Sequence, residues 1–113
     1  GRLAAIRWLI EFVGIAADQS GKPKDPVVRA HDASVDDLGG NRIDHSLPQA
    51  ALLARLWLGC SKASSHATRA SGHPPVDEKA IGEALLIIMA HLDREIYVGA
   101  GQKIADIALR PSP

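Results

Sequence analysis

The chain has little of several residue types, and each shortage argues against a class of protein. A single cysteine, Cys60, cannot form an internal disulfide, so the chain fits a reducing compartment and we expect the cytoplasm. No apolar run approaches the roughly 18 residues of a membrane span, so we expect no membrane partner. The 13 basic and 13 acidic side chains cancel, so no general attraction to nucleic acid is expected, although a local patch is compatible with this balance.

Recognised catalytic and cofactor motifs are missing as well. Gly21-Lys22 lacks the preceding glycine of a P-loop, and Gly99 and Gly101 follow a predicted helix instead of the strand of a dinucleotide-binding motif. No HExxH pair occurs, and the spacing of the histidines matches no standard zinc site. The sequence therefore predicts neither a metal nor a cofactor.

What the chain does have is helical periodicity, and it is clearest over residues 77–97. Apolar residues recur there at steps of three and four, at Ile81, Leu85, Ile88, Leu92 and Ile96. Asp77 stands where an N-cap belongs, directly after two prolines. Residues 85–89 are apolar without a break, which predicts a central helix that is covered on several sides.

A first helix is predicted over residues 2–18. Its apolar arc is wide, and its single narrow polar strip consists of Arg7, Glu11, Gly14 and Asp18. Trp8 and Ile15 flank this strip, so we expect both to be partly exposed in a monomer. Residues 18–26 are rich in glycine and proline and predict a break in the helix.

The next helix is predicted over residues 47–67. Ser46 and Gln49 have the spacing of a capping box around Pro48, which fits the first turn because its missing N–H is not needed there. Leu53, Leu56, Trp57, Cys60 and Ala63 make its buried face. Between the first two helices, residues 27–45 predict an irregular loop, with one helical turn capped by Ser34 and Asp37.

Together these patterns predict an all-α fold, a small helical bundle with three main helices (about 2–18, 47–67 and 77–97) and one or two short ones. One short helix is expected at residues 103–110. The length suits one domain, residues 1–113, and the start at Gly1 instead of methionine leaves a fragment of a longer chain as an alternative. The wide apolar arcs predict a homodimer, since exposed leucine-sized side chains are costly.

Two chemically versatile side chains receive structural interpretations. His91 lies one turn before Glu95, and we expect it to bond to a local carboxylate or carbonyl. Cys60 lies in mid-helix on an apolar face, where a thiol behaves as a small hydrophobic group.

One cluster of basic residues stands out, because no carboxylate occurs between Gln49 and Val76. Its members are Arg55, Lys62, His66, Arg69 and His73. In one interpretation they form a solvated face that is neutralised by acids on other elements, such as Asp32, Asp36, Asp37 or Glu83. In the other they bind an anion, with Arg55 and Lys62 as anion-binding groups, Arg69 holding phosphate and His66 or His73 transferring protons.

Two hypotheses about function follow from these patterns. The first is a non-enzymatic protein-interaction or regulatory module whose partner is a second copy of the chain. It rests on the wide apolar arcs and on the lack of any recognised catalytic constellation. The second is a nucleic-acid-binding or metal-independent ribonuclease domain that uses His66, Arg69 and His73 as catalytic residues, with RNA as partner. The chain has only four aromatic residues, and this small number argues against the recognition of nucleic acid by base stacking. A pocket for a small anionic ligand beside residues 68–75 is a third alternative, so enzymatic activity stays an open question at this point.

Overall fold

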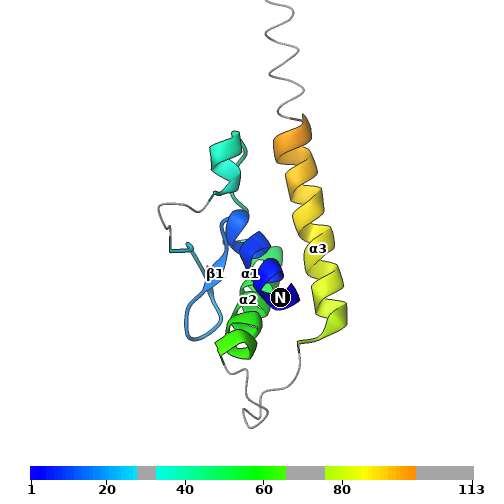
Figure 1. Cartoon of the computed structure of the whole chain (residues 1–113). Helices are drawn as coiled ribbons and strands as arrows, with labels where there is room; N and C mark the ends of the chain where they lie inside the picture. The colour runs from blue at the N-terminus through cyan, green and yellow to red at the C-terminus, as the bar shows by residue number, and fades with distance from the viewer. Residues whose placement is uncertain (28–32, 66–75, 99–113) are drawn as a thin grey trace, which may run out of the picture.

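The computed structural model describes residues 1–27, 33–65 and 76–98, and Figure 1 shows how the elements of these segments are arranged. In chain order the elements are α1 (Arg2–Phe12), β1 (Ala16–Ala17), β2 (Pro23–Lys24), the 3-10 helix η1 (Val35–Leu38), α2 (Pro48–Ser65), α3 (Glu78–Leu92) and the π-helix η2 (Asp93–Val98).

The first helix, α1, ends at Phe12, so the predicted extent to residue 18 is wrong. The amide of Gly14 donates to the carbonyl of Glu11 (2.9 Å), and the amide of Ile15 donates to the carbonyl of Ile10 (3.1 Å). This pair of bonds is a Schellman motif, in which Gly14 takes a left-handed φ of 93°. Ile15 then turns inward and is fully buried, contrary to the exposure expected for it, whereas Trp8 is 46% exposed.

A small hairpin follows this turn, and it was not predicted. β1 pairs antiparallel with β2, with Ala16 opposite Lys24 and Ala17 opposite Pro23. The loop between them is closed by the Asp18 carboxylate, which accepts hydrogen bonds from the amides of Ser20 (2.8 Å) and Lys22 (3.0 Å). Bonds to the Ser20 hydroxyl and to these amides hold the pKa of Asp18 below its usual value.

The helix at the centre of the molecule is α2, because α1, the hairpin and α3 all pack against it. Its fully buried side chains are Ala50, Leu53, Ala54 and Cys60. The predicted capping box at Ser46 does not form. The Asp44 carboxylate instead accepts from the amide and the hydroxyl of Ser46, both at 2.8 Å, and this turn leads into α2 at Pro48.

The periodic helix, α3, has the predicted N-cap, since the Asp77 carboxylate accepts from the amide of Lys79 at 3.0 Å. Only one of its faces is covered: Ile81, Ala84, Ile88 and His91 are buried against the rest of the protein. Leu86 and Met89 are 70% and 66% exposed, so the prediction of a central helix covered on several sides is wrong. The unbroken apolar run at 85–89 extends round to the solvent face of a peripheral helix (Figure 1).

The protein is thus mostly helical, with the three predicted main helices and a small two-stranded sheet. A strictly all-α fold is corrected by the hairpin, whose two-residue strands are too short to give an alternating pattern. The predicted helical turn at Ser34 is confirmed as η1, with its capping box. The predicted helix at 103–110 lies outside the described residues. Within the described ranges, no helix is long and apolar enough to cross a membrane.

Candidate functional site

Of the predicted site residues, the structure places Arg55 and Lys62. They are exposed on the solvent side of α2 and lie two helical turns apart, with Gly59 between them. The three predicted catalytic residues, His66, Arg69 and His73, lie outside the described residues, and their chemistry stays a prediction.

The hairpin adds two lysines beside this strip of α2. A Cβ at Gly21 would lie 3.7 Å from Cγ of Arg55, so the turn of the hairpin rests against the arginine stem. The hairpin also carries Lys22 and Lys24, which are both exposed. Sequence reasoning missed these two lysines, because they are separated from α2 by more than twenty residues.

Two of the four acids that were expected to neutralise the basic strip, which is Arg55 and Lys62 on α2, have partners elsewhere. Asp36 accepts from Nε of Arg42 at 3.2 Å, and Asp37 caps η1 by accepting from the amide of Ser34 at 2.7 Å. Glu83 lies on α3, on the other side of α2 from the hairpin, and Asp32 lies outside the described residues. Within the described segments, no ion pair is formed by Lys22, Lys24, Arg55 or Lys62.

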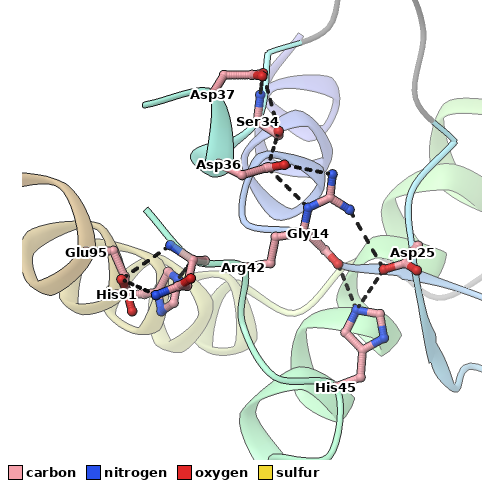
Figure 2. A network of polar contacts seen from close by, with 10 residues as sticks. Gly14, Asp25, Ser34, Asp36, Asp37, Arg42, His45, His91 and Glu95 are labelled. Atoms are coloured by element: carbon pink, nitrogen blue, oxygen red, sulfur yellow. Dashed lines mark hydrogen bonds and ion pairs between the residues drawn. The ribbon is translucent and has the colours of Figure 1, made fainter. Parts of the chain in front are cut away.

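Arg42 organises the segment between the hairpin and α2 (Figure 2). Its guanidinium lies between Asp36 and Asp25, with Nη1 3.8 Å from Oδ1 of Asp25. Its aliphatic stem crosses directly over Gly14, where an added Cβ would lie only 2.6 Å from Cβ of Arg42. Hydrogen bonds from the Ser34 hydroxyl and from Arg42 lower the pKa of the Asp36 carboxyl below its usual value.

Two histidines are described, and both bond to main-chain carbonyls. Nε2 of His45 lies 2.9 Å from the carbonyl oxygen of Gly14, and Nε2 of His91 lies 2.6 Å from that of Asn41. Because a carbonyl oxygen can only accept, Nε2 is the donor in both contacts. The carbonyl expected for His91 is confirmed, but it comes from a residue distant in the chain. Figure 2 shows both rings among the polar contacts drawn there.

Glu95 does not meet His91 and instead holds the same loop. Its Oε2 accepts from the amide of Asn41 (3.3 Å) and from Nδ2 of Asn41 (3.2 Å). Asn41 is therefore bonded both to Glu95 of η2 and to His91 at the end of α3. The approach is close, because a Cβ at Gly40 would lie 3.1 Å from Cβ of Glu95. These histidine contacts are therefore structural in kind: they fix the loop against α3.

Cys60 is fully buried in α2, and burial raises the pKa of its thiol. A thiol in this environment is a poor nucleophile, in agreement with the apolar role predicted for it. In the ranges 1–27, 33–65 and 76–98, no group of three histidine, cysteine, aspartate or glutamate side chains could hold a metal ion.

The second distinctive surface is the outward face of α3. Leu86 and Met89 are exposed there together with Gly82 and Ala90, at helical spacings that place all four on one face. Tyr97 and Val98, in η2, are 72% and 58% exposed and continue the apolar surface. We call the four residues of α3 the outer strip.

No family model, curated protein or solved structure matches this chain.

The two surfaces carry the functional argument. The residues of the outer strip are exposed on α3, and Arg55 and Lys62 are exposed on α2. The hairpin and α3 both pack against α2 (Figure 1). The sequence signalled both surfaces in part, through the apolar run at residues 85–89 and the absence of acids between residues 49 and 76. The sequence did not indicate that the apolar run at residues 85–89 is partly exposed on α3, or that the hairpin packs against α2 at Arg55.

Proposed function

We propose that this protein is a non-enzymatic interaction module that associates with a second copy of itself through the outer strip of α3. The observation that carries the proposal is the contrast between the two faces of one helix. Ile88 is 1% exposed, whereas Leu86, two residues before it, is 70% exposed and Met89, one residue after it, is 66% exposed. Large apolar side chains that gather on one solvent face are typical of interaction sites.

The composition of the outer strip favours a helix as its partner. Gly82 and Ala90 are small, and nothing lies within 4 Å of the position of a Cβ at Gly82. Small residues beside Leu86 and Met89 let a second helix approach closely and receive their side chains.

The charges along one edge of the strip favour a second copy in antiparallel orientation. Glu83 and Arg94 are exposed and eleven residues apart, so they lie near the two ends of the same edge. In a twofold pair of antiparallel helices each edge meets its own copy in reverse order. A crossing point between Leu86 and Ala90 therefore brings Glu83 of each protomer near Arg94 of the other.

The proposed location is the cytoplasm. A chain with one cysteine forms no internal disulfide, so it does not require an oxidising compartment. Support comes from Cys60, which is fully buried in the core of α2 and is the only cysteine of the chain.

Sedimentation velocity of the 113-residue protein over a concentration series tests the association. One pair of helices buries a small surface, so we expect a weak dimer that forms in the range of about 10 µM to 1 mM. Leu86→Lys should abolish it, because the lysine ammonium would be buried at the crossing point. The matched control is Leu38→Lys, which changes another exposed leucine, in η1 (59% exposed against 70% for Leu86), and should leave the dimer unchanged.

A charge exchange tests the orientation separately. Glu83→Arg and Arg94→Glu should each weaken the dimer, and the double variant should restore it, because the pair is recovered with reversed sign. A protein that is monomeric throughout the series overturns the proposed function. A dimer that survives Leu86→Lys overturns the assignment to α3, and a dimer that the double variant fails to restore overturns the antiparallel pairing.

A further inference from the structure

Three of the nine lysines and arginines in the described residues form ion pairs. Four of the other six lie on the hairpin and on the solvent side of α2, and the last two are Lys79 and Arg94. In the described part of the chain, Arg2 pairs with Glu78, Arg7 with Glu11, and Arg42 with Asp25 and Asp36. The lysines and arginine of the hairpin and of the solvent side of α2 form no ion pair with a carboxylate of residues 1–27, 33–65 or 76–98. We define these four residues, Lys22, Lys24, Arg55 and Lys62, as the basic face.

We propose that the basic face binds the phosphodiester backbone of a nucleic acid. Its positive charge is local, since α2 itself contains no acidic residue and the chain as a whole is neutral. Two carboxylates lie in or beside the hairpin, and both have other partners. Asp18 accepts from the Ser20 and Lys22 amides of its own loop, and Asp25 lies 3.8 Å from Arg42 and 3.5 Å from His45. A polyanion that approaches the basic face therefore meets four positive side chains that form no ion pair with a carboxylate of the described residues.

The shape of the face suits a phosphate chain. Arg55 and Lys62 are seven residues apart on α2, a rise of about 10 Å, which spans roughly three phosphates of one duplex strand measured along its axis. Gly59 lies between them, and a Cβ at this position would have no neighbour within 4 Å, so the helix surface is open there. The turn of the hairpin packs against Arg55 at Gly21, and the exposed Lys22 and Lys24 follow this contact by one and three residues.

The surroundings favour a nucleic acid over a lipid surface. Membrane binding by a basic surface is strengthened by exposed apolar side chains that enter the bilayer. None of the exposed large apolar residues of the described segments falls within residues 16–24 or 55–62. Trp57, the aromatic residue of α2, donates its indole N–H to Glu11 at 3.0 Å, so it is held inward and is not offered to bases. Binding should accordingly follow the backbone and be insensitive to sequence.

A salt series tests the proposal. Fluorescence anisotropy of the full chain with a 20-nucleotide RNA, and with DNA of the same sequence, should give an affinity that falls steeply with salt. Four phosphate contacts predict a slope of log K against log salt of about −3, and each cation removed should reduce the slope by about 0.7–0.9. Arg55→Gln and Lys22→Gln keep most of the aliphatic stem, and a melting curve for each variant checks that the fold is unchanged.

The control variant is Lys79→Gln, which removes one exposed lysine at the start of α3, away from the hairpin. It should leave the slope unchanged. Equal binding of RNA and DNA supports a backbone contact, and preference for RNA supports one that includes the 2′-hydroxyl. No binding at about 50 mM salt, an equal loss in Lys79→Gln, or binding only to vesicles containing phosphatidylserine would each overturn the proposal. The basic face and the outer strip share no residue, so a loss of binding in Arg55→Gln is separate from the loss of the α3 dimer in Leu86→Lys.

Discussion

The segment between α1 and α2 and the helix α3 differ in what holds them in place. The described parts of the first, residues 13–27 and 33–47, contain little regular structure, yet named polar contacts fix them. Arg42 joins Asp25 to Asp36, and His45 bonds to the carbonyl of Gly14. α3 is a regular helix, but its body is held through one apolar face, and its solvent face carries the exposed Leu86 and Met89.

This difference teaches that periodicity and coverage are separate properties. Periodic apolar residues make a helix form wherever one face can be buried, and they do not report what lies against the other face. An irregular segment gives no periodic signal, but buried main-chain groups need partners, and those partners specify its path residue by residue. The proposed dimer uses the uncovered face of α3.

The largest effect is expected when the same charge is placed on the buried face and on the exposed face of α3. Ile88→Asp should unfold the protein, because an aspartate at a site that is 1% exposed has no described partner, a cost of about 4 kcal/mol or more. Leu86→Asp, at a site that is 70% exposed, should keep the helical signal and the melting temperature. Thermal denaturation followed by circular dichroism compares the two variants. Equal melting temperatures would mean that α3 is not seated as described.

A second comparison sets two glycines against each other, one in each region. Gly14→Ala should destabilise the protein by about 1–3 kcal/mol, because φ is 93° and the new Cβ would collide with the Arg42 stem. Gly82→Ala should stabilise it by up to about 1 kcal/mol, since the site is an open position within α3. Urea unfolding measures both. A neutral Gly14→Ala would contradict the Schellman turn and the path of Arg42 across it.

The smallest expected effect is the pH dependence contributed by Asp36. Its folded pKa is lowered by the Ser34 hydroxyl and by Arg42, from a usual value of 3.8. A lowered folded pKa contributes stability above the unfolded value, and this contribution is lost as the pH falls through the folded pKa. The melting temperature should therefore decrease as the pH is lowered below about 4. The lowered pKa values of Asp18 and Asp44 contribute to the same loss of stability.

Asp36→Asn isolates this contribution in a series of melting curves. The wild type should be more stable than the variant near neutral pH, and the difference should shrink as the solution becomes acidic, because the protonated wild-type carboxyl then resembles the amide. A difference that stays constant with pH would show that the charge of Asp36 has no part in the network.

Local sequence signals predicted the helices and several of their ends. Asp77 caps α3 and Ser34 caps η1 as predicted, because a cap depends on residues three positions apart or fewer. The end of α1 was readable in principle: Gly14 followed by the apolar Ile15 is the signature of a Schellman turn. Arg55 and Lys62 were also placed on the correct, solvent side of α2 by their spacing.

Contacts between distant residues could not be read in this way. The loop at Asn41 meets His91 and Glu95 across about fifty residues, and the turn of the hairpin brings Gly21 to Arg55. The local sequence pattern of one segment does not predict which distant segment it contacts. The choice of α2 instead of α3 as the central helix is of the same kind, because it depends on which helix has apolar neighbours on several sides.

The sequence by itself determined that three helices form and which face of each is apolar, since these follow from side-chain spacing and from caps within a turn. Only the tertiary structure decided that α2 lies at the centre, that the outer strip of α3 stays exposed, and that the hairpin packs against α2. Those outcomes depend on how the faces pair in space, and a face with no partner looks the same in sequence as a face that is covered.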